Sequence, residues 1–421
     1  MISYLNMENG KKKILIHSLV FSPDGVSTAY LYNDIALAFK KARYDVVVLS
    51  TTPHFNVVEE QLKEQPLRWA LWPFYKKSQF HGIPVYHIPQ KKFKSTVLRL
   101  LGFVYWHIVS FLVGLIIKNV DVILSPSPPL TIGRINQWLG KLKGCKVVYN
   151  VQEIYPDILN ISPKSIVYKA LSRMECKVYN GSAAVTTIDQ VFYDTIVDRF
   201  ENRSKLHIIP NFVDTDLYHP GVSTEALDKN LFPDNDCIKL LYAGNIGFAQ
   251  DWEPLIRLAE KTRDMNVEYF LIGMGVKKQW VEEQKEAKGL DKLHILGYQP
   301  RQLMPAILSY SDLQYIFMTP AQEGMGFPSK VYTIMACGRP LLVCSGDGTP
   351  IVNFLKPLGC AKLVTSHDLE KKTDEMAAWL GSITREKLRE MGALGEETIR
   401  KQYTKEIVAG QYIRLVNSLL G

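Results

Sequence analysis

KLLYAGNIG, residues 239–247, is an apolar run that ends in a turn with two glycines, and the helical pattern DWEPLIRLAEKT follows it at 251–262. A buried strand, a glycine turn and an amphipathic helix in this order form the repeating unit of an α/β sheet. Glycine at such a turn lets backbone amides approach a phosphate, and the helix dipole adds a favourable potential. A plain strand-to-helix turn explains the same residues, so this stretch by itself predicts a fold and not a ligand.

The same unit recurs along the whole chain. Short apolar runs lie at 14–21, 45–50, 121–126, 146–151 and 183–188, and again at 239–244, 268–273, 293–297, 313–318 and 340–345. The runs are continuously apolar rather than alternating, which is typical of parallel strands covered on both faces. Helix-length segments separate them. The sequence therefore predicts an α/β protein of two Rossmann-like, doubly wound domains, with the ligand in a cleft between them.

A linker separates the two series of strands. The segment KLHIIPNFVDTDLYHP (205–220) contains two prolines and an Asp-rich turn. We therefore expect one domain at 1–204 and a second at 205–404. The final helical pattern, 405–420, has no strand after it, so it must pack on a domain that is already built.

Composition narrows the class of protein. The chain has 421 residues, of which 47% are hydrophobic and 22% charged, as in soluble globular proteins and unlike disordered or coiled-coil chains. The formal charge of +8 suits an acidic membrane surface, phosphorylated substrates or nucleic acid. No RNA or DNA motif accompanies the basic residues, so a nucleic-acid partner is not expected. The six cysteines lack CxxC or CxH spacing, which indicates reduced thiols rather than disulfides or a zinc site.

LLGFVYWHIVSFLVGLII, residues 100–117, differs from this soluble character. It contains no acidic residue, lysine or arginine, and its 18 residues only just reach the length needed to span a bilayer. A basic cluster precedes it, formed by Lys91, Lys92, Lys94 and Arg99. We expect a helix that lies in the membrane interface, with Tyr105 and Trp106 as interfacial aromatics, rather than a span or a buried helix. The N-terminus shows no export signal, so we expect a cytoplasmic protein, peripheral to the membrane.

EGMGFPSKVYTIMACGRP, residues 323–340, lies between two of the expected strands and begins a short helix. Pro328 can fix the entry of the chain and Ser329 can cap the helix, while Lys330 lies in its first turn. A lysine there opposes the helix dipole at a cost of a few tenths of a kcal/mol. A bound diphosphate would reverse that sign, so Lys330 is the candidate ligand of a nucleoside diphosphate. A solvated lysine is the alternative.

Other strand ends carry polar or small residues. VYNVQEIYPDILN (148–160) places Gln152, Glu153 and Asp157 just past a strand, where they act either as helix caps or on substrate hydroxyls and protons. Gly25, in SPDGVST, allows a backbone N–H to face a ligand. GMG (273–275) is a second glycine turn. Neither GxGxxG nor GxxxxGK[ST] occurs, so nicotinamide and P-loop sites are not expected. No metal-ligand cluster is evident.

In their order and spacing, these motifs resemble the retaining, metal-independent GT-B glycosyltransferases of family 4. Within that family they are most similar to the bacterial branch that builds capsule, O-antigen or colanic-acid repeat units. The resemblance covers nearly the whole chain and rests on SPDGVST, DVILSPSPP, VQEIYPD, IPNFVDTDLYHP, LLYAGNIG, FLIGMG, LHILGYQP and FPSKVYTIMACGRP. It implies transfer of a hexosyl or N-acetylhexosaminyl group from a nucleoside-diphosphate sugar, UDP-linked, without a cofactor. It also implies that residues 405–421 complete the first domain.

The resemblance assigns roles to individual residues. It places the donor near Gly25, Gly244, Asn245, Gly273, Gly297, Tyr298, Glu323, Ser329, Lys330 and Thr333, with Lys330 on the pyrophosphate and residues 296–298 reading the base. Glu153, beside Gln152, is expected near the acceptor or the sugar. The chain also departs from the family pattern. Asn245 and Gln250 stand where many relatives carry Arg and Lys, Thr333 stands at the ribose-binding Glu, and Gln152 stands at a His. Glu323 fits the first Glu of the E-x7-E pattern only after a loop shift.

The expected acceptor is a polyprenyl-diphosphate-linked saccharide at the cytoplasmic face of the inner membrane, because 100–117 and its basic neighbours would bring the site to that surface. Two other functions stay open at this point. A sugar-nucleotide epimerase shares the architecture and the diphosphate site. An inactive, membrane-associated homologue would account for the missing Glu, Arg and His.

Overall fold

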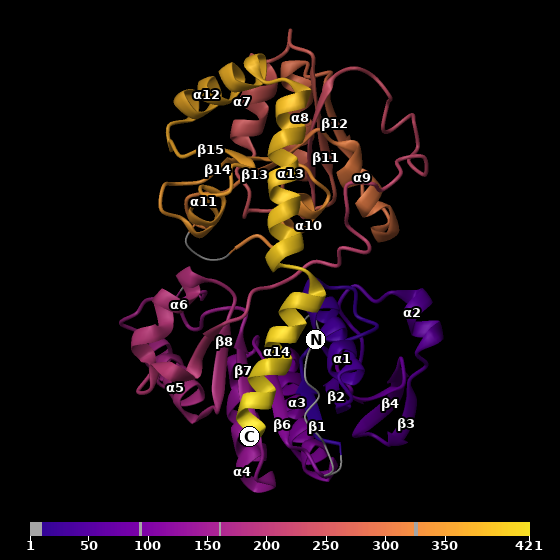
Figure 1. Cartoon of the computed structure of the whole chain (residues 1–421), viewed down its shortest axis with the longest axis vertical. Helices are drawn as coiled ribbons and strands as arrows, with labels where there is room; N and C mark the ends of the chain where they lie inside the picture. The colour runs from indigo at the N-terminus through magenta and orange to yellow at the C-terminus, as the bar shows by residue number, and fades with distance from the viewer. Residues whose placement is uncertain (1–10, 92–94, 160, 324–326) are drawn as a thin grey trace. The chain divides into compact units, whose positions relative to one another are not determined.

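The computed structural model describes residues 11–91, 95–159, 161–323 and 327–421. Two compact units form the chain. The first comprises Met1–Asn211 together with Lys405–Gly421, and the second comprises Phe212–Thr404. Figure 1 labels most of the elements of each unit.

The first unit is built on a nine-stranded sheet in the order β3-β4-β5-β2-β1-β6-β7-β8-β9. The strands are β1 (Lys13–His17), β2 (Asp45–Thr51), β3 (Arg68–Leu71), β4 (Tyr75–Phe80), β5 (Ile83–Ile88), β6 (Val122–Pro126), β7 (Lys146–Val151), β8 (Ala184–Thr187) and β9 (Leu206–Ile208). All pairings are parallel except those of β4 with β3 and with β5. The helices are α1 (Ser27–Lys41), α2 (Glu59–Glu64), α3 (Thr96–Ile116), α4 (Leu130–Lys143), α5 (Ile166–Gly181), α6 (Gln190–Ile196) and α14 (Lys405–Leu420).

The second unit has a six-stranded parallel sheet in the order β12-β11-β10-β13-β14-β15. Its strands are β10 (Ile238–Ala243), β11 (Val267–Ile272), β12 (Leu293–Leu296), β13 (Leu313–Phe317), β14 (Leu341–Cys344) and β15 (Ala361–Val364). Its helices are α7 (Glu253–Lys261), α8 (Lys278–Lys288), α9 (Met304–Tyr310), α10 (Lys330–Ala336), α11 (Pro350–Leu355), α12 (Leu369–Ser382) and α13 (Arg385–Gln402). The strand order reverses between β10 and β13, and ligands of doubly wound sheets bind at such a switch point.

The predicted fold class is confirmed, since both units are doubly wound α/β sheets. The expected domain boundary needs a correction. Leu206–Ile208 forms β9 and pairs with β8, so this segment lies in the first sheet rather than in the second domain. The cleft that the sequence predicts between the domains stays a prediction.

Local sequence explains several helix ends. Ser95, Ser165 and Asp189 accept hydrogen bonds from backbone N–H groups three residues on, at the starts of α3, α5 and α6. Gly144 ends α4 in the left-handed conformation (φ 68°), which glycine adopts without strain. These caps satisfy backbone groups that a helix end would otherwise leave unpaired.

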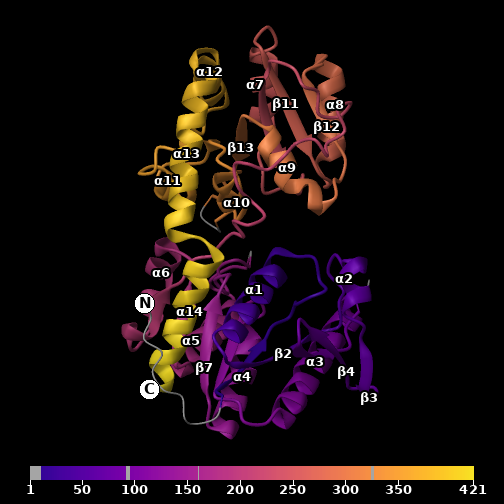
Figure 2. The same ribbon diagram turned by 45° about the vertical axis from the view of Figure 1, so that its right-hand side comes forward.

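In the first unit, helices cover both faces of the sheet. Buried residues of α3, α4 and α5 share one core cluster with alternate residues of β1, β2 and β6. On the opposite face, α14 packs against α1, and it lies beside α1 in both ribbon views (Figures 1 and 2). The C-terminal helix is therefore part of the first unit although almost two hundred residues of the second unit precede it.

Helix α3 is buried on one side and exposed on the other. Trp106, Val109 and Val113 are buried in the core of the first unit, while much of the remaining surface of the helix is exposed. Among the described residues, α3 is the helix long and apolar enough to cross a membrane. Of the basic cluster before it, Lys92 and Lys94 lie outside the described residues.

Candidate functional site

Two glycine turns meet at the C-terminal ends of β10 and β11. Gly244 and Gly273 have φ values of 152° and 140°, which side chains rarely adopt. A Cβ atom on Gly273 would lie 1.9 Å from the carbonyl oxygen of Gly244, and one on Gly275 would lie 2.2 Å from that of Ile246. The two loops are therefore in direct backbone contact, joined by a hydrogen bond from Ile246 N to Met274 O (2.9 Å).

Lys330, the first residue of α10, reaches across the switch point to the end of β10. Its Nζ donates to the carbonyl oxygen of Ala243 at 3.2 Å and lies 3.7 Å from the centroid of the Tyr242 ring. A Cβ atom on Gly244 would come within 2.6 Å of Nζ. Any side chain at position 244 would therefore displace the ammonium group.

The Lys330 ammonium is held in an unfavourable environment. Burial lowers its pKa from 10.5 to about 7, with no described carboxylate near enough to oppose the shift. An uncompensated buried cation is costly, and such groups concentrate at functional sites. An anion bound here would restore the charged form, because an opposite charge within hydrogen-bond distance raises the pKa of an ammonium.

Three predicted residues surround α10 in different ways. Ser329 has a helical conformation (φ −57°, ψ −23°) and makes no capping hydrogen bond, so its expected role as the cap is wrong. The hydroxyl of Thr333 donates to the carbonyl oxygen of Lys330 at 2.9 Å, within its own helix. Glu323 is buried, and its carboxylate accepts from Gly346 N at 2.7 Å, with His367 Nε2 at 3.8 Å. Glu323 is thereby tied to the C-terminal end of β14.

The remaining predicted donor residues of this unit lie in two places. Asn245 is exposed beside Gly244, whereas Gln250 is buried and accepts from Phe317 N at 3.1 Å. Gln250 thus holds the end of β13 in place. Gly297 and Tyr298 follow β12; the Tyr298 side chain is 74% exposed, and the space beside Gly297 is open.

In the first unit, Gly25 differs from its expected role. Its N–H donates to the carbonyl oxygens of Phe55 (3.2 Å) and Asn56 (2.9 Å), so this group is already paired and does not face a ligand. A Cβ atom on Gly25 would lie 2.5 Å from Asn56 O. Close contact between two loops therefore explains this glycine.

Gln152 and Glu153 follow β7 and differ in the hydrogen bonds that their side chains make. The Gln152 amide pairs reciprocally with the Asn211 amide, each donating to the other at 3.0 Å, and it also donates to Asn150 Oδ1 at 2.7 Å. The Glu153 carboxylate accepts from the Tyr155 hydroxyl at 3.0 Å. Of the two, Glu153 is the group with a titratable oxygen, while Gln152 positions the loop.

Asp157 has a structural partner rather than an open face. Its carboxylate accepts from Arg199 and, at 2.6 Å, from the Tyr168 hydroxyl. The same Arg199 pairs with the fully buried Glu175, whose pKa burial raises to about 7. This ion-pair network joins the loop after β7 to α5. Among the described residues, no cluster of three His, Cys, Asp or Glu side chains could hold a metal ion.

Residues 223–392 match the model of the family "Glycosyl transferases group 1". The second unit is a group 1 glycosyl transferase domain. The glycine turns and Lys330 are therefore features of a glycosyl transferase domain, at the switch point of its sheet.

Similar proteins support this assignment over a longer stretch. The chain is 23% identical over 346 residues to WcaI of Escherichia coli, a protein named as a colanic acid biosynthesis glycosyl transferase, covering 77% of this chain and 81% of that one. Its fold matches sucrose-phosphate synthase from Thermosynechococcus elongatus with a TM-score of 0.72 and 14% identity, over 97% and 99% of the two chains. It also matches HepE of Anabaena, solved with UDP and glucose, with a TM-score of 0.70 and 15% identity, over 97% and 100%. The two-domain GT-B fold thus extends over nearly the whole chain.

Two residues beside the candidate site residues, one in each unit, were not expected from the sequence. Tyr242 supplies the ring beneath the Lys330 ammonium, and its hydroxyl donates to Asn245 O at 2.9 Å. Its position inside a buried strand gave no functional signal. Asn150, buried at the end of β7, binds Tyr32, Tyr412 and Thr186 beneath the Gln152–Glu153 loop. A polar residue in an otherwise apolar strand was the available signal for Asn150.

Proposed function

We propose that this chain is a retaining glycosyltransferase that moves a sugar from a UDP-linked donor to a lipid-linked saccharide in surface polysaccharide synthesis. The single observation that carries the proposal is the partly buried Lys330 ammonium, which lies on the Tyr242 ring beside the Gly244 turn of a group 1 domain, with no described carboxylate to compensate its charge. UDP bound to HepE and the colanic acid role named for WcaI support the donor and the pathway class.

The donor diphosphate would bind across the Gly244 and Gly273 turns, with Asn245 beside it and Lys330 on the phosphate oxygens. The uridine would lie by Gly297 and Tyr298, where the surface is open. Glu323, Ser329 and Thr333 would line the sugar and ribose side. Gly25 would take part through the shape of its loop, because its N–H is already paired.

Charge development on the leaving group would be the main difficulty of the reaction. The bond between the anomeric carbon and the β-phosphate oxygen would break to release UDP, the acceptor oxygen would bond to that carbon, and the acceptor proton would pass to the leaving diphosphate. The protonated Lys330 would stabilise the growing negative charge of UDP, and preorganised groups of this kind contribute strongly to catalysis. Glu153 would interact with the acceptor or the sugar, and Gln152 would hold that loop in place.

The acceptor proposal rests on α3. A polyprenyl-diphosphate-linked saccharide lies in the inner membrane, and the exposed apolar side of α3 would bring the enzyme to the cytoplasmic face of that membrane.

A nucleotide panel tests the donor. A ligand of the native state raises the unfolding midpoint, so UDP and UDP-sugars should raise it more than ADP- or GDP-compounds do. Sugar transfer is then measured with the stabilising donor and membrane lipid extracts. Conversion of the sugar without an acceptor would indicate an epimerase, and binding without turnover would indicate an inactive homologue. No shift with any nucleotide would contradict the proposal.

A further inference from the structure

The β3–β4 hairpin lies at one edge of the first sheet and exposes large apolar side chains. All four residues of β3 are exposed, and around the connection to β4 the exposed fractions are 47% for Trp69, 52% for Leu71, 74% for Trp72 and 41% for Phe74. Exposed tryptophans are unusual on a soluble domain, and grouped apolar side chains of this kind mark a contact surface. We call Trp69–Phe74 the hairpin tip.

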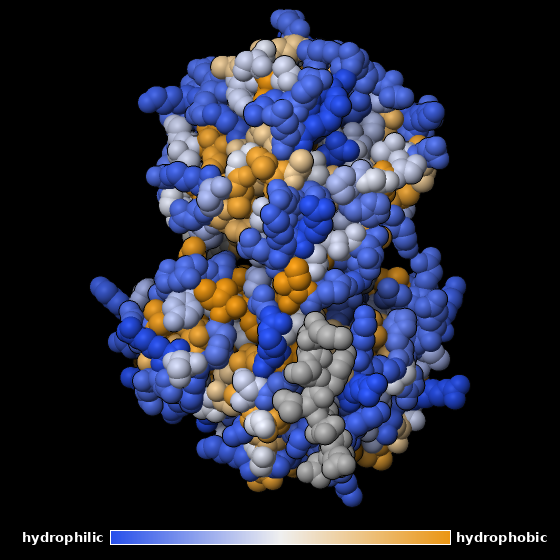
Figure 3. Space-filling model, viewed as in Figure 1, coloured by the Kyte–Doolittle hydropathy of each residue, from blue (hydrophilic) through white to orange (hydrophobic). Residues whose placement is uncertain are grey.

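The hairpin tip is fixed to α3. The hydroxyl of Tyr105 on α3 donates to the carbonyl oxygen of Pro73 at 3.0 Å. The exposed side of α3 continues the apolar surface through Val97, Leu98, Leu100, Leu101, Val104, Ile108, Leu112, Leu115 and Ile116. Figure 3 shows the side of the first unit that carries α14, where hydrophilic side chains are interspersed with apolar ones. The hairpin tip and α3 therefore form one apolar surface.

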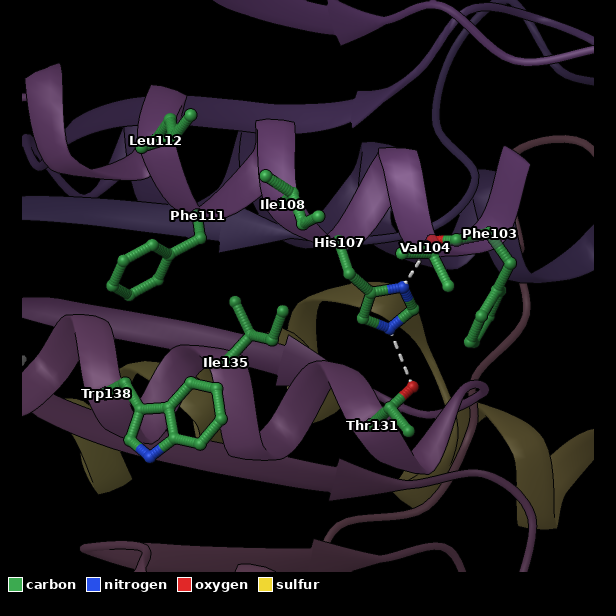
Figure 4. Close-up of a pocket in the computed structure, with 9 residues that line it drawn as sticks. All are labelled: Phe103, Val104, His107, Ile108, Phe111, Leu112, Thr131, Ile135 and Trp138. Carbon is green, nitrogen blue, oxygen red and sulfur yellow. Dashed lines mark hydrogen bonds between the residues drawn. The ribbon is translucent and has the colours of Figure 1, made fainter. Parts of the chain in front are cut away.

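A groove between α3 and α4 extends this surface. Its volume is about 400 Å³, and its walls include Val104, Ile108 and Trp138. The polar side chains in its lining, His107 and Thr131, bond to each other at 2.7 Å, and His107 also bonds to Phe103 O (Figure 4). The groove thus offers mainly apolar contact.

Tryptophan placement points to a membrane. Of the seven tryptophans, the three exposed ones, Trp69, Trp72 and Trp138, all lie on the hairpin tip or in the groove. The other four are buried or partly buried in the cores of the two units. Tryptophan prefers the interface between hydrocarbon and lipid headgroups, where its ring is buried and its N–H stays near polar groups.

The positive charge around this surface favours an anionic partner. From Gln65 to Val120 the sequence contains eight lysines and arginines and no acidic residue, and α4 adds three more cations without an acid. Lys76 lies 4.8 Å from the centroid of the Trp69 ring, and the Arg134 guanidinium lies 5.7 Å from that of Trp138. Cations beside interfacial aromatics match the phosphates of an anionic bilayer.

We propose that the β3–β4 hairpin is a membrane-insertion loop, which docks the first unit on an anionic bilayer together with α3 and the α3–α4 groove. This inference deepens the proposed function, because membrane docking would bring the enzyme to a lipid-linked acceptor. It rests on the proposed function only for that role, since membrane binding by the hairpin can be tested without any sugar transfer. Trp72 would enter the headgroup layer first, because it is the most exposed of the three tryptophans.

Vesicle binding tests the hairpin directly. The full chain is sedimented with phosphatidylcholine vesicles containing about one third phosphatidylglycerol, and with pure phosphatidylcholine. We expect binding to the anionic vesicles, weakened at least tenfold by Trp69→Ser with Trp72→Ser and by Lys76→Glu with Lys77→Glu, and weakened by salt. Ile166→Ser is the matched control, since Ile166 is an 86% exposed apolar residue of the same unit on α5. Vesicles with brominated acyl chains should quench wild-type tryptophan fluorescence and quench the tryptophan variant less.

Three results would overturn the inference. The tryptophan variant could bind anionic vesicles as well as the wild type does, or both lipid compositions could bind equally. The wild type could instead form a dimer that the tryptophan variant loses, with no vesicle binding, which would assign the surface to a second copy of the chain. Stabilisation by UDP is measured on the same variants. Its retention shows that the fold and the donor site are intact, so failure of the hairpin is separable from failure of the proposed function.

Discussion

Lys330 is the residue at which the sequence and the structure agree most closely. From sequence it was a lysine in a first helical turn, opposed to the helix dipole. In the structure its ammonium lies on the Tyr242 ring and against a backbone carbonyl, with its pKa lowered to about 7. Such a residue lowers the stability of the unliganded protein and is explained by a ligand that compensates it.

Replacing Lys330 by methionine should stabilise the unliganded protein near pH 7. The folded pKa is about 7 and the unfolded value is 10.5, so between these pH values the unfolded chain binds more protons. The stability of the wild type therefore rises with pH in this window, and the penalty is fully present below it. Urea unfolding at pH 7 and pH 9 should show Lys330→Met as the more stable protein at pH 7, with a smaller difference at pH 9. A constant difference, or a less stable variant at pH 7, would contradict the lowered pKa.

The affinity for the donor should depend on the protonation state of Lys330. A UDP-sugar that binds the protonated lysine raises its pKa, so binding takes up protons when the free enzyme is partly deprotonated. The dissociation constant should be nearly constant below pH 7 and rise above it, approaching tenfold per pH unit. Calorimetry in buffers of different ionisation enthalpy measures the proton uptake at pH 8. Equal affinity at pH 6.5 and 8.5, or proton uptake retained by Lys330→Met, would separate Lys330 from the donor.

Other residue predictions failed for a common reason. Ser329 does not cap α10, and the Gly25 N–H is paired with Phe55 and Asn56. A residue type and its neighbours in sequence indicate what a group can do, but tertiary contacts decide which partner it finds. Tyr242 shows the converse, because only the fold brings its ring beneath Lys330.

At the scale of elements, the continuous apolar runs predicted the central strands well, because burial on both faces leaves a simple pattern. The β3–β5 segment, residues 68–88, was not predicted. Its strands mix exposed aromatics, lysines and a proline, and they carry little of the period-two pattern of a half-buried strand. The missed elements are the ones that carry the proposed membrane surface.

Helix α14 should be a structural support of the Glu153 loop. Tyr412 is buried and its hydroxyl accepts from Asn150 Nδ2 at 3.0 Å, at the end of β7. Tyr412→Phe removes this partner and should lower the free energy of unfolding by about 1–2 kcal/mol. Ser418→Ala, on the same helix but with its hydroxyl bonded locally to Leu415 O, should change it by less than about 0.5 kcal/mol. Denaturant unfolding compares the two. Equal effects would remove the supporting role of Tyr412.

At the scale of the whole molecule, two α/β units divide the work. The group 1 domain carries the diphosphate features. The first unit carries Glu153, the exposed apolar surface and the basic excess, because the second unit has more acidic than basic residues. The formal charge of the chain is +8, and Gln65–Val120 alone contributes eight cations without an acid. The order of the sequence motifs along the chain was sufficient to predict the fold, because each motif marks the end of a strand. The identities of the acceptor and of the transferred sugar leave no comparable pattern in the sequence.

The central claim is that Lys330 stabilises the diphosphate of a sugar donor. Lys239 provides a matched control in the same sheet. Its ammonium also donates to a backbone carbonyl oxygen, that of Asn235 at 2.8 Å, and lies 5.1 Å from an aromatic ring centroid, that of Tyr310, but Lys239 is near the opposite end of β10. The decisive measurement is turnover of the stabilising UDP-sugar by Lys330→Ala and Lys239→Ala. We predict that Lys330→Ala lowers kcat about 10²- to 10³-fold in a folded protein, while Lys239→Ala keeps kcat within about twofold. A folded Lys330→Ala enzyme with wild-type kcat would contradict the account.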